Sequence, residues 1–124
     1  GFFNLMLGRS KEAVSLFRQS RKGADAANPA FQKELLYNLG TALMKENEVQ
    51  EAEDAFKAAL NPATQVKDWR KLAGAQQHLA GFAGKRGDTD TQRALLYKAM
   101  EAAEQGELKD ERKAIKKRID ALGA

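Results

Sequence analysis

Residues 37–60 read YNLGTALMKENEVQEAEDAFKAAL, and this stretch decides the fold class. In its first half, Leu39 and Leu43 repeat at the spacing of one helical face. In its second half, Ala52 and Phe56 repeat at the same spacing. The alternation of apolar and polar residues that is typical of β-strands is scarce along the whole chain. The pattern therefore predicts an all-α fold.

Asn, Pro and Gly mark where the helices start and stop. Asn28-Pro29 and Asn61-Pro62 predict helix starts, because Asn can cap the free N–H groups and Pro at the first helical position gives up a donor without a partner. Asn47 and Gly87 suit the left-handed residue that closes a helix. These signals predict seven helices, over residues 1–7, 10–22, 29–46, 48–60, 63–84, 89–105 and 108–122. Since the loops are short, we expect antiparallel helical hairpins.

The sequence overlays itself at two offsets. A shift of 39 carries Glu12-Ala13 onto Glu51-Ala52, and a shift of 33 carries Asn28-Pro29 onto Asn61-Pro62. Such self-similarity predicts stacked hairpins, in which each hairpin needs a neighbour to bury its second face. Small residues such as Gly40 then let two helices approach closely, and large residues fill the space beside them.

Three parts of the middle segment, YNLGTAL at 37–43, EA at 51–52 and FKAAL at 56–60, resemble one tetratricopeptide repeat, a pattern of 34 residues. The resemblance is strong over residues 33–62 and partial over 1–32 and 63–105. It implies a single domain over residues 1–124, an antiparallel helix-hairpin solenoid with a right-handed superhelical twist and about three repeats. The implied parts are a truncated first repeat (1–28), a second repeat (29–62), a degenerate third repeat (63–105) and a capping helix (107–122).

The last predicted helix has the pattern of such a cap. Its apolar residues, Leu108, Ile115, Ile119 and Leu122, fall on one stripe, and charged residues occupy the other faces. We expect the stripe to close the stack and the charged faces to meet water.

In this family the first helices of the hairpins line a concave groove, so the resemblance also implies a binding surface. The implied groove residues are Phe2, Leu5 and Met6 in the first repeat, Glu34, Tyr37, Asn38, Thr41, Met44 and Lys45 in the second, and Lys67, Arg70, Lys71, Gly74, Gln77 and His78 in the third. The groove is then apolar at one end, mixed in the middle and cationic at the other. It suits a peptide with apolar residues followed by acidic ones. For the three residues of the first repeat, a place in the core is an equal alternative.

Some members of the family grip a C-terminal carboxylate with a clamp of Lys, Asn, Asn, Lys and Arg. Asn38, Lys67 and Lys71 match three of these positions, with Lys71 in place of Arg. Phe2 stands at the position of the first Asn, so the sequence departs from the clamp there. The clamp is therefore an alternative to a more general use of the groove.

The composition excludes several classes of function. The chain has no cysteine and one histidine, so it has neither a thiolate metal site nor a Cys nucleophile. No carboxylate shares the helical face of His78, and we predict no catalytic, metal-binding or cofactor-binding residues. No apolar run approaches the ~20 residues needed to cross a bilayer, so no membrane insertion is expected. The sequence thus predicts a non-catalytic scaffold or adaptor that binds another protein or peptide.

Two other functions stay open. Self-association would pair the end around Phe2, Phe3 and Leu5 between two copies of the chain. Nucleic-acid binding would use the basic face from Lys109 to Arg118, but acidic residues dilute that face, and the net charge of the chain is only +4. We therefore do not expect nucleic acid as a partner. The lack of cysteine fits both the cytoplasm and a bacterial periplasm, with the cytoplasm the first choice.

Overall fold

A computed structural model describes residues 28–123 as five α-helices joined by three-residue turns. The helices are α2 (Pro29–Lys45), α3 (Val49–Gln65), α4 (Trp69–Lys85), α5 (Thr89–Gln105) and α6 (Lys109–Ala121). No strand occurs in this part of the chain, which confirms the predicted all-α class. The helices predicted over 1–7 and 10–22 lie outside the described residues. Among residues 28–123, none of the helices has both the length and the apolar character needed to cross a membrane.

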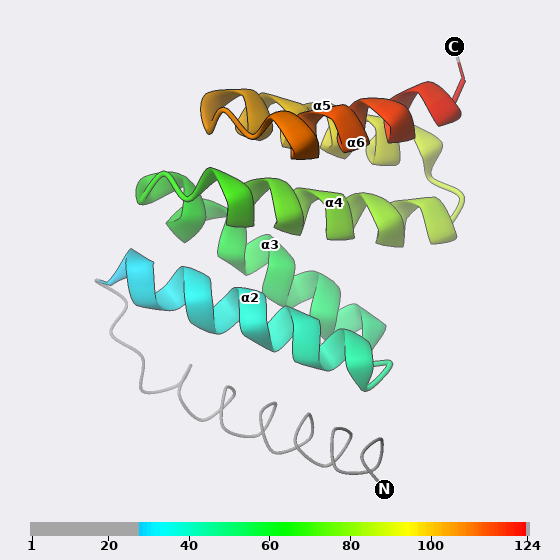
Figure 1. Cartoon of the computed structure of the whole chain (residues 1–124). Helices are drawn as coiled ribbons and strands as arrows, with labels where there is room; N and C mark the ends of the chain where they lie inside the picture. Colours follow the sequence, from blue (N-terminus) through cyan, green and yellow to red (C-terminus); the bar gives the residue numbers. More distant parts are fainter. Residues whose placement is uncertain (1–27, 124) are drawn as a thin grey trace, which may run out of the picture.

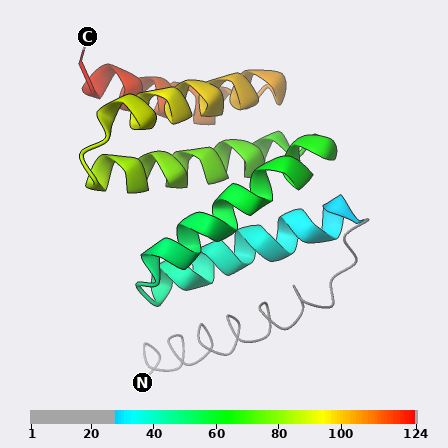
Figure 2. The ribbon, with the colours of Figure 1, turned by 180° about the vertical axis from the view of Figure 1, so that it is seen from behind.

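Helices that follow one another in sequence pack against one another, from α2 on α3 to α5 on α6. Figure 1 shows α2, α4 and α6 running in the same direction on the near face of the molecule. In the reverse view of Figure 2, α3 passes in front of α2 and α5 passes in front of α6. The described residues therefore form a front layer of α2, α4 and α6 and a back layer of α3 and α5.

The four turns share one backbone geometry. Each contains a residue in the left-handed region, namely Asn47 (φ 60°), Lys67 (φ 58°), Gly87 (φ 79°) and Glu107 (φ 55°). The next residue donates its N–H to a carbonyl five residues earlier, as Glu48 does to Leu43 at 2.9 Å. This is the Schellman arrangement, which satisfies the free carbonyls at a helix end. The roles predicted for Asn47 and Gly87 are confirmed.

The helix start predicted at Asn61-Pro62 is wrong. α3 continues through both residues, and α4 begins at Trp69 instead of residue 63. The start is set by Asp68, whose side chain accepts a hydrogen bond from the backbone N–H of Lys71 at 3.1 Å and so caps α4. Pro62 lies in the last turn of α3 and is buried. Packing of its ring therefore offsets the backbone hydrogen bond that it cannot make.

This correction changes the spacing of the hairpins. The α2–α3 hairpin begins at residue 29 and the α4–α5 hairpin begins at residue 69, so equivalent positions lie 40 residues apart instead of 33 or 39. The predicted end of the second repeat at residue 62 falls inside α3. The helices predicted at 29–46, 89–105 and 108–122 agree with the structure to within one residue at each end.

An aromatic cluster fills the space between α2, α3 and α4. Its buried members are Leu39, Ala42, Leu43, Ala52, Ala55, Phe56, Ala75, Leu79 and Phe82. Gly40 brings α2 so close to the Phe56 ring that a Cβ at residue 40 would lie 2.8 Å from two ring carbons. The close approach that the sequence predicts at Gly40 is confirmed.

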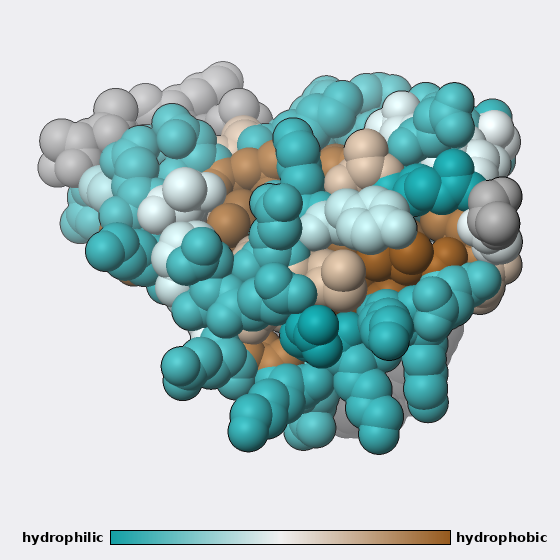
Figure 3. Space-filling model, turned by 90° about the horizontal axis from the view of Figure 1, so that it is seen from above, coloured by the Kyte–Doolittle hydropathy of each residue, from teal (hydrophilic) through white to brown (hydrophobic). Residues whose placement is uncertain are grey.

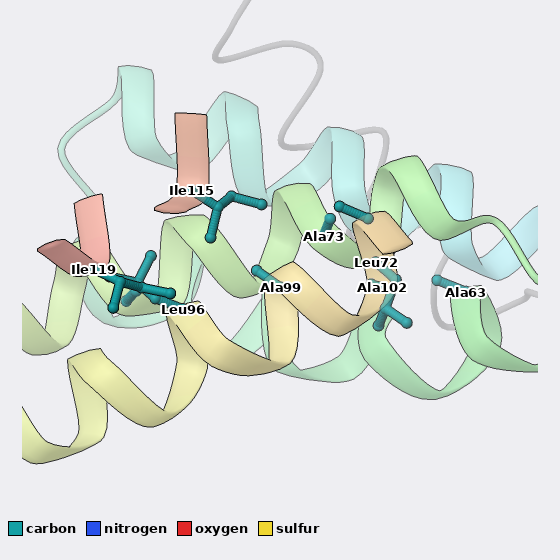
Figure 4. Close-up of a cluster of buried hydrophobic side chains, with 10 residues drawn as sticks. Ala63, Leu72, Ala73, Leu96, Ala99, Ala102, Ile115 and Ile119 are labelled. Carbon is teal, nitrogen blue, oxygen red and sulfur yellow. The ribbon is translucent and has the colours of Figure 1, made fainter. Parts of the chain in front are cut away.

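An alanine cluster joins α3, α4, α5 and α6 (Figure 4). Its buried members are Ala63, Leu72, Ala73, Ala80, Leu96, Ala99, Ala102, Ala103, Ile115 and Ile119. Alanines make up most of it and let α4 and α5 approach closely, while Ile115 and Ile119 cover it from α6. Seen from above in Figure 3, this end of the molecule is mostly hydrophilic. The buried stripe and charged outer faces predicted for the last helix are thus confirmed.

Candidate functional site

A pocket of about 420 Å³ opens on the front layer, between α2, α4 and the end of α6. We call it the groove pocket. Its lining consists of Tyr37 and Met44 from α2, Gly74, Gln77, His78, Gly81, Phe82 and Lys85 from α4, and Arg118 from α6. The structure therefore brings together five groove residues that the sequence predicts: Tyr37, Met44, Gly74, Gln77 and His78.

Tyr37 reaches across to α4 because a glycine at residue 74 leaves room for it. A Cβ at Gly74 would lie 2.7 Å from the Tyr37 hydroxyl oxygen. The Tyr37 ring meets Phe56 edge-on, with 5.5 Å between centroids, and its centroid lies 6.1 Å from that of His78. Burial, together with the charge of Asp68, raises the pKa of Tyr37. The phenol therefore stays protonated and can donate a hydrogen bond to a ligand.

His78 packs against the aromatic cluster. Its ring stacks on Phe56, with 4.6 Å between centroids and 17° between planes. Burial lowers the pKa of His78, and the positive charge of Arg118 lowers it further. The imidazole is therefore uncharged at neutral pH, and it offers the pocket a polar ring but no positive charge.

The positive charge of the pocket comes from Lys85 and Arg118. Lys85 lies in the last turn of α4 and Arg118 in the last turn of α6. Arg118 Nη1 donates to Gln77 Oε1 at 3.3 Å. In residues 28–123, no carboxylate forms an ion pair with either cation. Among these described residues, no carboxylate lines the pocket either.

Two cations that the sequence assigns to the groove are neutralised by acids. Lys71 Nζ lies 3.4 Å from Glu34 Oε1 and 5.4 Å from the centroid of the Tyr37 ring. Arg70 Nη1 lies 2.5 Å from Glu111 Oε1. The positive charge of this pocket is therefore located at the ends of α4 and α6, whereas Arg70 and Lys71 lie outside it in ion pairs.

Lys33, which was not predicted as a groove residue, adds further ion pairs beside Lys71. It forms ion pairs with Asp68 and with Glu34, the latter at 3.1 Å. Burial opposes ionisation of both acids, but the hydrogen bonds from Lys33 and the charge of Lys71 outweigh it, so the pKa values of Glu34 and Asp68 are lowered. The hydrogen bond to Asp68 raises the pKa of Lys33 in turn. This region is a set of internal ion pairs.

The remaining predicted residues lie outside the pocket. The exposed ones are Asn38, Lys45 and Lys67, the last in the α3–α4 turn. Thr41 donates its hydroxyl to the Tyr37 carbonyl at 3.1 Å, within its own helix. Phe2, Leu5 and Met6 lie outside the described residues, and so does Phe3 of the self-association surface. Of the three clamp positions, Asn38 and Lys67 do not line the pocket, and Lys71 is paired with Glu34.

The sequence did not predict four of the pocket residues, namely Gly81, Phe82, Lys85 and Arg118. On α4, residues 74, 77, 78, 81 and 85 share one face, so continuing that face to the end of the helix would have found Gly81 and Lys85. Arg118 lies 40 residues after His78, at the equivalent position of the next front-layer helix. The sequence offsets of 33 and 39 could not reveal this equivalence.

The groove pocket offers contact surfaces and hydrogen-bond donors. Within residues 28–123, no three acidic or histidine side chains are grouped so that they could hold a metal ion. The lining instead combines a thioether, aromatic rings and two cations, which suits recognition of a ligand that is partly apolar and partly charged. When the chain is compared with protein-family models, curated proteins and solved structures, none of them matches it.

Proposed function

We propose that this chain is a non-catalytic protein–protein interaction module, which binds a peptide segment of a partner protein along the front layer. The proposal includes a tetratricopeptide-like solenoid of helix hairpins closed by α6. Two features support it: the antiparallel hairpins that recur along the chain and the resemblance carried by residues 33–62. The two described hairpins are longer than the 34-residue pattern of that family, because their helices have 17 residues each and are joined by three-residue turns.

The groove pocket is the observation that carries this proposal. It places the apolar side chains of Tyr37 and Met44 in an open concavity, where Met44 is 36% exposed, and Phe82, only 6% exposed, lies at its wall. Exposed apolar surface in a concavity loses water favourably when a ligand covers it. The helices on either side are each 17 residues long, about 25 Å, so an occupant can extend beyond the pocket along the layer.

Gly81 gives a means of closing the pocket without disturbing the fold. A Cβ at residue 81 would meet no other atom within 4 Å. A leucine there can therefore project into the pocket, and it is a better helix former than glycine. Gly81→Ala is the matched control, because it makes the same backbone change with only one added carbon.

The test uses a phage-displayed library of random 12-residue peptides selected on the full chain. We expect selected peptides to bind Gly81→Leu at least about tenfold more weakly than the parent protein, since covering one large apolar side chain contributes roughly 1.5–3 kcal/mol. Gly81→Ala should change the affinity little. Tyr97→Ala, on the exposed surface of α5 in the back layer, should leave it unchanged. Fluorescence polarisation gives the affinities, and circular dichroism confirms folding.

Two results would reject the proposal. One is a selection that yields no binding peptide. The other is a set of peptides that bind Gly81→Leu as tightly as the parent protein, or that lose affinity equally with Tyr97→Ala.

A further inference from the structure

The charges that line the groove pocket have one sign. Lys85 and Arg118 line it, and no carboxylate does. Elsewhere on the front layer, Glu34 is paired with Lys33 and Lys71, and Glu111 is paired with Arg70. Arg118 is held only by a neutral amide, that of Gln77, and a carboxylate would be a stronger acceptor for it.

The C-terminal ends of α4 and α6 offset part of this positive charge. The C-terminus of a helix carries a partial charge of about −0.5, which favours a cation in the last turn. Lys85 and Arg118 end α4 and α6, so two positive side chains face about one negative charge from the two helix ends. The helix ends therefore offset these two cations only in part, and among residues 28–123 the pocket lining adds no acid.

The other part of the pocket is apolar. Met44 and Tyr37 come from α2, and the buried Phe82 of α4 contributes to the same lining. Methionine adapts its shape to different apolar partners, so this part can accept aliphatic and aromatic side chains alike. The pocket therefore has an apolar side next to a cationic end.

We infer that the segment bound in the groove pocket is acidic, with an Asp or Glu side chain placed a few residues from a large apolar side chain. The apolar side chain packs on Tyr37, Met44 and Phe82, and the carboxylate accepts hydrogen bonds from Lys85 and Arg118. The carboxylate is an internal one, because Asn38 and Lys67, which match a clamp for a chain terminus, lie outside the pocket. This inference rests on the proposed function and names the class of peptide.

The test asks what the selected 12-residue peptides contain and which cations they need. Asp and Glu should be enriched relative to the unselected library. A C-terminally amidated peptide of the selected sequence should bind, and its Glu→Gln or Asp→Asn counterpart should bind about tenfold more weakly, since hydrogen bonds to charged groups contribute about 1.5–3 kcal/mol. The double variant Lys85→Gln/Arg118→Gln should bind the acidic peptide more weakly than the parent protein by a similar factor.

Control variants distinguish the effect of the two pocket cations on binding from the effect of the overall charge of the protein. Lys98→Gln/Lys113→Gln removes the same two charges from exposed positions on α5 and α6 and should leave the affinity within about twofold, since screened surface charges act weakly. The reversal Lys85→Glu/Arg118→Glu should turn the selection towards Lys- and Arg-containing peptides. Since both side chains lie at helix ends on the surface of the pocket, circular dichroism should show an intact fold.

The outcomes distinguish this inference from the proposed function. If the selected peptides depend on Gly81 but carry no excess of Asp or Glu, or bind Lys85→Gln/Arg118→Gln unchanged, the inference is overturned and the groove stands. If Lys85→Gln/Arg118→Gln and Lys98→Gln/Lys113→Gln weaken binding equally, the peptide is attracted by the overall charge of the protein, and the inference is again overturned. If no selected peptide depends on Gly81, both proposals fall.

Discussion

The aromatic cluster and the alanine cluster fill the space between neighbouring helices in different ways. In the aromatic cluster, the ring of Phe56 fills a space that Gly40 leaves open on α2. In the alanine cluster, most buried side chains are methyl groups, and the branched chains of α6 cover them. One cluster therefore combines two phenylalanine rings with leucines and alanines around Gly40, and the other consists mostly of alanines between close backbones.

The two clusters also differ in what they touch. Phe56 stacks under His78, and Phe82 belongs to both the aromatic cluster and the pocket lining. No member of the alanine cluster lines the groove pocket. The difference teaches that the core and the groove pocket share side chains in one half of the described chain and are separate in the other. Substitutions in the two clusters can test this directly.

Phe56→Ala should have the largest effect. Phe56 is fully buried, so the free energy of unfolding should fall by about 3–5 kcal/mol in urea denaturation. The loss should also reach the pocket, because His78 loses the ring on which it stacks and becomes more accessible to water. The pKa of His78, followed by NMR on the sole histidine of the chain, should then rise towards 6.5. An unchanged titration would contradict the link between cluster and pocket.

Leu96→Ala is the counterpart in the alanine cluster. Leu96 is also fully buried, and its truncation should lower the free energy of unfolding by about 2–5 kcal/mol. Since Leu96 belongs to the back layer and to a cluster outside the pocket, the pKa of His78 should stay at its parent value. A shift of that pKa as large as the one in Phe56→Ala would show that the clusters are not separate.

Two glycine substitutions should have opposite signs. At Gly40 an added methyl group would meet the Phe56 ring at 2.8 Å, and overpacking of this kind should destabilise the protein by about 1–3 kcal/mol. At Gly81 the added methyl group meets open space, so Gly81→Ala should stabilise the helix by about 0.5–1 kcal/mol. Thermal denaturation of both variants compares the two sites, and equal shifts would contradict the packing described for Gly40.

Acidification should produce the smallest effect. The folded chain holds the pKa of His78 below 6.5, so between that lowered value and 6.5 the unfolded chain binds a proton that the folded chain does not. The free energy of unfolding should therefore fall as the pH drops through 6.5 and level off below the folded pKa. Glu34 and Asp68, whose pKa values are lowered, should act only at lower pH, as it falls through 4.5 and 3.8.

His78→Gln separates these two ranges of pH. It should remove the decrease near pH 6.5 and leave the acid-range decrease in place, when urea denaturation is repeated across the pH range. A parent protein whose stability is flat between pH 7 and the acid range would contradict the buried, uncharged state of His78.

Local signals in the sequence were enough to predict most helices. Asn28 accepts a hydrogen bond from the Phe31 N–H at 3.2 Å, as the Asn-Pro start of α2 predicts. The same dipeptide at residues 61 and 62 does not start a helix, because Asp68 provides a competing cap and buried Pro62 packs in α3. Local propensity could not decide between these two starts, since the decision depends on packing between helices.

The pocket could be predicted only in part, for a related reason. Tyr37, Met44 and His78 lie on helical faces that periodicity identifies. Arg118 enters the pocket from α6 and contacts Gln77, 41 residues earlier, a contact that exists only once α6 packs beside α4. The neutralisation of Arg70 by Glu111 is likewise a contact across 41 residues. Charges counted along the sequence therefore do not show which cations are paired with acids in the fold.

The equal spacing of the four left-handed turn residues has a consequence for changes in chain length. One residue inserted within α4 between His78 and Lys85 would rotate the rest of that helix by about 100° and carry Lys85 off the face that it shares with His78. The same residue inserted in a turn would leave every helix with its own face intact. Insertions and deletions compatible with this architecture should therefore fall in the three-residue connections or comprise whole 40-residue hairpins.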